Sequence, residues 1–209
     1  MTGPLAPRFR WTARTDGDFA GDLSARQPGW TWLRQVHGAQ VVVVRSPGEH
    51  AGAEADAAVT DTLGCPLVVR TADCAPVILA GNRTVGVVHV GWRGLLDGVV
   101  ERTVAALREL GDDPLVAHLG PCIRPGCYEF GEADAAPIAE RYGRGVLATT
   151  SWGTAALDLP AAVQAAVARA GVTGWHDEAG CTACDRRWFS HRARAEPERL
   201  ATVAWLEAG

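Results

Sequence analysis

Short apolar stretches recur along the chain from Trp30 onward, and most of them are rich in valine. Each is about as long as a β-strand and is bounded by Gly, Pro or Asn, which is the pattern of strands separated by turns. Several are apolar at every position, which favours sheets that are covered on both faces. We therefore predict strands at 40–44, 66–70, 76–80, 84–90, 115–119 and 200–206.

Three segments between these strands have apolar residues three or four positions apart, as on one face of an amphipathic helix. The segment 94–110 has the clearest spacing and is followed by a glycine. The segment 158–170 begins with an Asp and carries Pro160 in its first turn, both of which are common at helix starts. The segment 132–142 is a weaker helix. Helices that alternate with strands predict an α/β domain.

Residues 1–29 do not share this periodicity. They are rich in Arg, Asp, Gly and Pro, and we expect an irregular lead-in with one edge strand. No internal repeat and no low-complexity linker divides the sequence. The lead-in is therefore expected to belong to the same single domain as residues 30–209.

The charge balance is mildly acidic. The chain of 209 residues has a formal net charge of −4, with Arg far more frequent than Lys and both signs mixed along its length. That balance offers no basic surface for nucleic acid or anionic membranes. No apolar run reaches membrane-spanning length, and the first residues lack the core of a signal peptide. Six cysteines in this setting are expected to be reduced thiols, so we expect a cytoplasmic protein; composition does not define its oligomeric state.

Three residues that commonly bind metals lie at the ends of predicted strands. His37 comes just before one strand, Cys74 lies between two others, and His89 is near the end of the strand 84–90. Two imidazoles and one thiolate suit Zn²⁺ and also tolerate copper. Three protein ligands leave a fourth position for water or substrate, as in catalytic sites. The alternative is that each residue is an ordinary core side chain, because distance in sequence does not determine distance in space.

The segment 89–94 (HVGWRG) joins a strand to a predicted helix. Free backbone N–H groups, the helix dipole and the guanidinium of Arg93 would favour a phosphate or carboxylate there. The alternative is that Arg93 is a solvated surface charge, since glycine-rich turns between strands and helices are common.

The cysteine pair near the C-terminus, Cys181 and Cys184, admits a second metal hypothesis. Together with Cys122 and Cys127 it would make a four-thiolate zinc site. However, Cys122 and Cys127 are spaced too widely for the usual zinc knuckle, and the pair lacks the strand–helix setting of a redox motif. We therefore interpret these four residues, like Cys65, as ordinary structural thiols.

With these motifs in order, the chain resembles the laccase-domain family, also called the multicopper polyphenol oxidase family and associated with purine nucleoside phosphorylase activity. The resemblance extends over residues 30 to 206 and keeps the order and spacing of the motifs. The matching segments are 32–38 (WLRQVHG), 71–76 (TADCAP), 89–94 (HVGWRG), 119–123 (LGPCI), 127–130 (CYEF), 157–159 (LDL), 181–185 (CTACD), 188–190 (WFS) and 200–206 (LATVAWL).

The resemblance implies a layered α/β/β/α fold, shared with a group of putative cysteine hydrolases. It implies a metal held by His37, Cys74 and His89. Members look like enzymes that phosphorolyse adenosine, inosine and methylthioadenosine and deaminate adenosine, so purine nucleoside and phosphate are the expected ligands. Earlier naming attached a copper-dependent polyphenol oxidase activity to the family, and a bacterial branch is linked to peptidoglycan editing.

We assign further roles as hypotheses. In deamination, zinc lowers the pKa of the water that it binds, and Asp73, next to the ligand Cys74, would transfer the proton. In phosphorolysis, Arg93 and the N–H groups of its turn would hold the phosphate. Gln35, in a matching segment, and Arg14, in the segment 12–17 (TARTDG) that preserves only a trace of a family motif, are expected to join Arg93 in binding substrate.

Other function classes remain open. Cys74 and His89 could form the nucleophile and base of a hydrolase. A copper oxidase is less favoured, because only six His are available for a multicopper cluster: 37, 50, 89, 118, 176 and 191. The third alternative is a non-catalytic, metal-stabilised module that binds a nucleoside or a protein partner.

Overall fold

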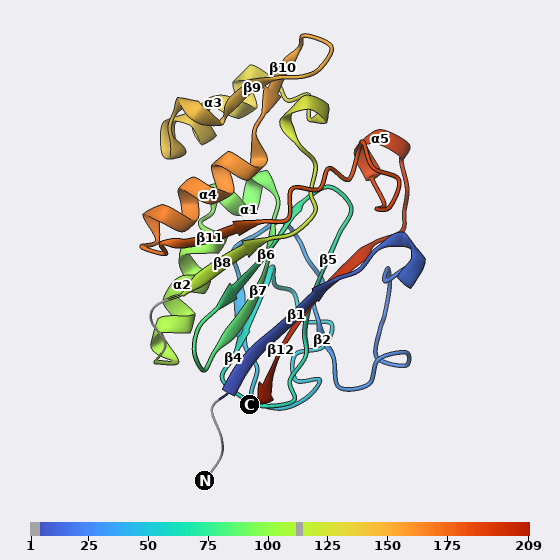
Figure 1. The fold of residues 1–209 in the computed structure, drawn as a ribbon, viewed down its shortest axis with the longest axis vertical. Coiled ribbons are helices and arrows are strands. Elements are labelled where there is room, and N and C mark those ends of the chain that lie inside the picture. The colour runs from blue at the N-terminus through green and yellow to red at the C-terminus, as the bar shows by residue number, and fades with distance from the viewer. Residues whose placement is uncertain (1–4, 112–114) are drawn as a thin grey trace.

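The structure is a computed structural model, and it describes residues 5–111 and 115–209. Residues 1–4 of the expected lead-in lie outside this range. Two sheets face one another, and the longer helices lie beyond one of them (Figure 1). The mixed α/β single domain that the sequence predicts is therefore confirmed.

The larger sheet has six strands in the order β11-β8-β6-β7-β4-β3. Its centre is the antiparallel pair β6 and β7, whose residues are almost all buried because helices cover one face and the second sheet covers the other. The strands are β3 (Val41–Val43), β4 (Ala57–Thr60), β6 (Ala75–Ala80), β7 (Val85–Val90), β8 (Val116–Leu119) and β11 (Gly174–Asp177).

The smaller sheet has the order β1-β12-β5-β2. Its first strand, β1 (Leu5–Trp11), is the edge strand expected in the lead-in, and it pairs antiparallel with β12 (Leu200–Ala208) from Leu5 opposite Ala208 to Trp11 opposite Thr202. The other strands are β5 (Leu67–Thr71) and β2 (Thr31–Trp32).

Apolar side chains fill three layers. Val77, Val88 and other residues of the six-stranded sheet pack under the helices. Leu67 and Ile78 belong to the cluster between the two sheets. The outer face of the smaller sheet is covered by the segment before β2, through Phe19 and its neighbours. The lead-in is thus a structural layer of the domain.

The three helical segments that the sequence predicts are helical, with one correction, and a further short helix near the C-terminus was not predicted. The single helix expected at 94–110 is two helices, α1 (Trp92–Leu96) and α2 (Val99–Glu109), because Gly98 between them has a φ of 82°, a left-handed conformation that ends α1. The others are α3 (Glu132–Tyr142), α4 (Leu159–Arg169) and α5 (His191–Arg194). None of the helices in the described ranges is long and apolar enough to cross a membrane.

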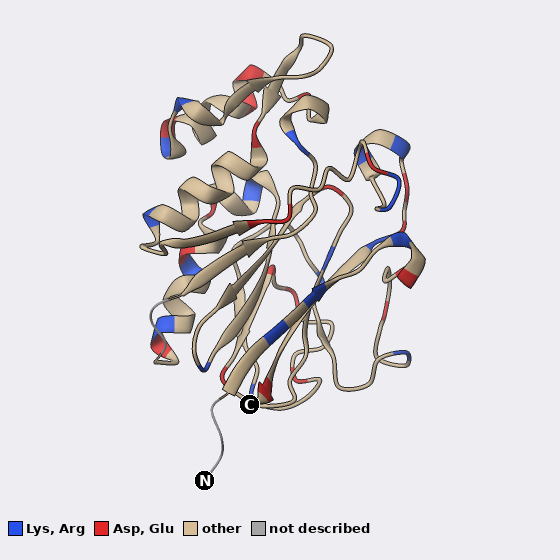
Figure 2. Ribbon diagram, viewed as in Figure 1, with Lys and Arg blue, Asp and Glu red and all other residues tan. Residues whose placement is uncertain are grey.

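Some elements escaped the sequence pattern. The strand β4 is only four residues long and follows Asp56, and β9 (Leu147–Thr149) and β10 (Ala155–Leu157) form a small separate hairpin. Charges of both signs are interspersed along the described chain, as its composition indicates (Figure 2).

Candidate metal centre

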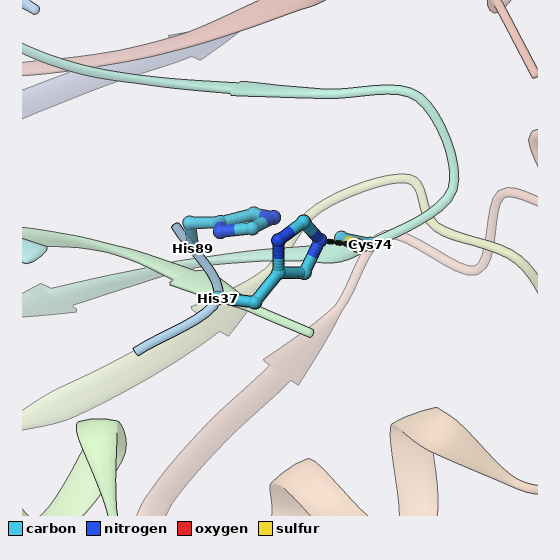
Figure 3. A group of neighbouring side chains, drawn as sticks. All are labelled: His37, Cys74 and His89. Atoms are coloured by element: carbon cyan, nitrogen blue, oxygen red, sulfur yellow. Dashed lines mark hydrogen bonds between the residues drawn. The ribbon is translucent and has the colours of Figure 1, made fainter. Parts of the chain in front are cut away.

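His37, Cys74 and His89 come together at one end of the sheets. One ligand atom from each lies within 4.8 Å of the others. Figure 3 shows the two imidazole rings and the Cys74 side chain gathered at one point. The ring centroids of His37 and His89 are 4.9 Å apart, and Cys74 Sγ is 3.8 Å from His37 Nε2. The three residues therefore offer a compact ligand set drawn from three separate segments.

The pairing of β6 with β7 explains part of this convergence. Pro76 lies opposite His89 in the antiparallel register, so Cys74, just before β6, reaches the same end of the sheet as the end of β7. His37 comes from the loop between β2 and β3 and has a φ of 61°, a left-handed conformation that a non-glycine residue seldom adopts. Something must hold that loop in place.

Asp56 holds it. This carboxylate is completely buried and accepts hydrogen bonds from the backbone N–H groups of Val36, His37 and Gly38, at 3.2, 3.0 and 2.8 Å. Its Oδ1 also lies 2.7 Å from His89 Nδ1. Asp56 thus joins the His37 loop to the His89 ring and directs His89 Nε2 away from itself, as carboxylates do behind metal-binding histidines.

Sequence reasoning missed Asp56. The available signal was a single carboxylate next to a short apolar segment, 55–60 (ADAAVT), where an unpaired charge would be costly. Burial alone would raise the pKa of Asp56, but the hydrogen bond and charge of His89 and the backbone N–H groups lower it. Asp56 is therefore an anion in the fold.

Two glycines of the segment 89–94 make room for the His37 loop. A Cβ on Gly91 would lie 2.6 Å from His37 Cδ2, and a Cβ on Gly94 would lie 2.7 Å from the carbonyl oxygen of Gly38. Real side-chain atoms do not approach so closely. These glycines are thus needed for packing beside the metal ligands, which accounts for them without a bound anion.

The ligand set is electrostatically coupled. Burial would raise the pKa of the Cys74 thiol, but the charge of His89 and hydrogen bonds from both histidines lower it to about 6. Burial would lower the pKa of His89, but the Cys74 thiolate and Asp56 raise it to about 9. A thiolate next to an imidazolium is therefore the stable metal-free form at neutral pH. The thiolate is also the form that binds metals.

The three residues line a cavity of about 500 Å³. Its wall carries the guanidinium groups of Arg70 and Arg199 and that of Arg34, which is paired with Glu54 at 2.6 Å; His191 also lines it, and no Asp or Glu of the described chain is among the lining residues. Such a wall favours an anionic ligand. Gln35 lines the same cavity, but its side-chain amide exchanges two hydrogen bonds of 2.8 Å with the backbone of Arg70.

Asp73 lies next to the centre but its carboxylate is engaged elsewhere. It is 8% exposed, and its oxygens accept hydrogen bonds from Thr182 Oγ1 at 2.6 Å, Ser190 Oγ at 2.7 Å and the backbone N–H of Arg192 at 2.6 Å. Its φ of 107° places the following Cys74 at a sharp bend. These contacts favour a role in positioning Cys74, whereas the proton-transfer role stays a prediction.

The structure does not place Arg93 or Arg14 among the residues that line the cavity. Arg93 is exposed in α1, and its guanidinium lies 4.6 Å from the centre of the Trp92 ring. Arg14 forms an ion pair of 2.6 Å with Glu196 and stacks on Phe189. Their predicted contacts with substrate stay predictions, and the cationic wall consists of other residues.

Comparison with known proteins gives consistent matches. Residues 14–207 match the family model described as "Multi-copper polyphenol oxidoreductase laccase". The chain is 44% identical to a purine nucleoside phosphorylase of Xylella fastidiosa over 186 residues, which cover 84% of this chain and 71% of the relative. It is 42% identical over 184 residues to a purine nucleoside phosphorylase of Streptomyces coelicolor, covering 84% of this chain and 74% of the relative.

Solved structures show the same architecture. The hypothetical protein YfiH of Bacillus licheniformis superposes with a TM-score of 0.77 at 25% identity, covering 86% of this chain and 74% of that chain. A Neisseria meningitidis protein from the family designated DUF152 has the same TM-score at 29% identity, covering 89% of this chain and 78% of that chain.

Proposed function

This chain belongs to the family described as multi-copper polyphenol oxidoreductase laccases, and we propose that it is a metal-dependent enzyme that cleaves purine nucleosides with phosphate. The observation that carries the proposal is the cationic cavity in which His37, Cys74 and His89 meet. Relatives that carry the name purine nucleoside phosphorylase support the substrate class. Adenosine, inosine and methylthioadenosine are the proposed nucleosides.

The donor set fits a zinc ion and also accepts copper. Two imidazole nitrogens and one thiolate are ligands that Zn²⁺ favours, and three of them leave one position for substrate or water. Cys74 lies half-buried between the buried His89 and the exposed His37, so the open side of the set faces solvent through the cavity. A bound Zn²⁺ would supply Lewis-acid polarisation at this point.

The residues of the chain would do the remaining work. Asp56 keeps the His89 ring oriented with Nδ1 toward the carboxylate. The guanidinium groups of Arg70 and Arg199 would favour phosphate, and both are held by backbone carbonyls, Arg70 by that of Leu33 at 2.8 Å and Arg199 by that of Pro197 at 2.7 Å. His191, exposed on the cavity wall, would protonate the departing purine.

Product analysis tests this proposal. Zinc-loaded protein is incubated with adenosine, with and without phosphate, and the products are separated. Phosphorolysis gives adenine and ribose 1-phosphate only when phosphate is present, whereas deamination gives inosine without it. His89→Ala should abolish turnover, and His50→Ala, a histidine that does not line the cavity, should retain it. Absence of phosphate-dependent adenine from the wild-type protein would contradict the proposal.

A second comparison tests whether phosphate is bound by the arginines of the cavity wall or by Arg93, as the sequence suggested. Arg199→Met should raise KM for phosphate about tenfold, because one charge-assisted hydrogen bond contributes about 1.5 kcal/mol. Arg93→Met, outside the wall, should leave KM for phosphate close to the wild-type value. A raised KM for phosphate in Arg93→Met, with an unchanged KM in Arg199→Met, would instead mean that the turn of Arg93 binds the phosphate.

A hydrolase with a thiol nucleophile is the second candidate, because Cys74 and His89 form a thiolate–imidazolium pair in the metal-free protein. Such an enzyme keeps its activity in chelators and loses it with iodoacetamide. Loss of activity in chelators, with recovery on adding zinc, supports the metalloenzyme. Recovery with copper alone, accompanied by oxidation of phenols, would support the oxidase. We also propose a cytoplasmic location, since all six cysteines are free thiols.

A further inference from the structure

A second group of metal-binding side chains lies apart from the cavity. Cys127 ends a short 3-10 turn (Pro125–Cys127), and Cys181 and Cys184 lie in the turn after β11. Ligand atoms of these three residues are within 4.8 Å of one another, and the sulfurs of Cys127 and Cys184 are 2.7 Å apart. Cys122 is fully buried and is not part of the group. The proximity of these three sulfurs reopens the metal hypothesis for Cys127, Cys181 and Cys184, whereas Cys122 stays outside it.

The backbone prepares these sulfurs for an ion. The N–H of Asp185 donates to the carbonyl of Cys181 at 3.0 Å, which closes the turn and brings Cys181 and Cys184, three residues apart, to the same side.

The two segments are also fixed to each other. The N–H of Cys122 donates to the carbonyl of Gly180 at 3.2 Å, and the N–H of Thr182 donates to the carbonyl of Cys122 at 3.1 Å. Arg194 holds the far side of the turn through the carbonyls of Thr182 and Ala183. The position of the three sulfurs therefore follows from the backbone and does not require a disulfide.

We propose that Cys127, Cys181 and Cys184 bind a second metal ion through three thiolates, and that the ion is a thiophilic cation such as Zn²⁺. Thiolates are preferred zinc ligands, and a divalent cation would offset the repulsion between three closely spaced sulfurs. Cys184 is exposed while the other two are half-buried, so the fourth position opens to solvent. This site is distinct from the His37–Cys74–His89 centre and shares no ligand with it.

The proposed ion would also help to hold Cys74, a ligand of the first centre, in position. Thr182, between the two cysteines of the turn, is fully buried and donates to the Asp73 carboxylate. Asp73 directly precedes the ligand Cys74. An ion that holds the turn would thus hold Thr182, and through it the bend that presents Cys74. The role of this ion is structural, and the ion does not contact the substrate.

Zinc content of the reduced, desalted protein tests the site. The wild-type chain should bind two equivalents, and the His37→Ala/His89→Ala double variant should retain one. Cys184→Ser, at an exposed position, should also leave one. Cys65→Ser is the matched control, because Cys65 is a free thiol outside both groups, and it should leave two. A wild type with a single equivalent that Cys184→Ser does not change would overturn the proposal.

A second measurement detects the thiolate ligands directly, in a variant that keeps all three cysteines. In the His37→Ala/His89→Ala variant, Cd²⁺ should produce the charge-transfer absorption of three thiolates, and Zn²⁺ should raise the thermal midpoint. Adding Cys127→Ser to that variant should remove both effects. Absence of thiolate absorption, or an intact mass showing a Cys127–Cys184 disulfide under reducing conditions, would contradict the site.

Discussion

His89 Nδ1 lies 2.7 Å from Asp56 Oδ1, and both side chains are buried. The same carboxylate accepts hydrogen bonds from the backbone N–H groups of the loop that carries His37. One residue thus sets the orientation of one proposed ligand and the backbone position of another. A buried carboxylate without partners would be costly, and these hydrogen bonds offset that cost for Asp56.

Replacing this carboxylate should weaken metal binding without removing any ligand. We expect Asp56→Asn to lower zinc affinity by about 10–100-fold, the usual effect of losing the partner of a metal-binding histidine. Competition with a chromogenic chelator measures the affinity. Asp61→Asn, an exposed carboxylate near the same strand, is the control and should bind as the wild type does. Equal affinities in the two variants would mean that Asp56 has no part in the centre.

The pH dependence of zinc binding follows from the pKa values of Cys74 and His89 in the metal-free protein. In the metal-free protein Cys74 ionises at a pKa of about 6 and His89 loses its proton at about 9. Between neutral pH and about 9, zinc must therefore displace one proton, from His89, so its affinity should rise about tenfold per pH unit. Above about 9 the affinity should level off. Calorimetry in buffers of different ionisation enthalpy counts the protons, and release of none at neutral pH would refute this account.

Gly91 should not tolerate a side chain. Gly91→Ala places a Cβ 2.6 Å from His37 Cδ2, so the His37 ring must move away from Cys74 and His89. We expect loss of zinc from this centre, seen as one equivalent fewer per chain. Gly145→Ala is the matched control, since nothing lies within 4 Å of its Cβ. If both variants retain the wild-type zinc content, the packing explanation for the HVGWRG segment fails.

Replacing Asp73 tests whether this residue positions Cys74 or carries a proton during turnover. Asp73→Asn weakens three hydrogen bonds to a buried carboxylate, so the free energy of unfolding should fall by about 1.5–3 kcal/mol. Denaturant titration measures this loss, and the rate of turnover is measured alongside it. A proton carrier would instead show unchanged stability and a lost ionisation in the pH–rate profile, which would contradict the positioning role.

The sequence predicted the regular elements well where the hydrophobic pattern was long. The strands β6, β7, β8 and β12 were recognised because their short apolar runs contain valine and are bounded by turn residues, a pattern that favours strands over helices. The break between α1 and α2 was missed, because one glycine inside an apolar pattern does not reveal its φ. Strand β4 was missed because two of its four residues are alanines, which are depleted in strands.

The candidate site was only partly predictable, for a physical reason. His37, Cys74 and His89 could be proposed from their chemistry and their place at strand ends. Asp56 acts through contacts between segments, which the local pattern does not encode. The proximity of Cys127 to Cys181 and Cys184 could not be inferred from their spacing, because only the fold buries Cys122 and brings Cys127 to the distant pair.

The most direct test is the anomalous scattering of crystals of the zinc-loaded protein at the zinc absorption edge. The account predicts a peak at about 2.0–2.3 Å from His89 Nε2, Cys74 Sγ and a ring nitrogen of His37, with Asp56 on the other nitrogen of His89. A map of fully loaded protein with no peak between these three side chains would contradict it.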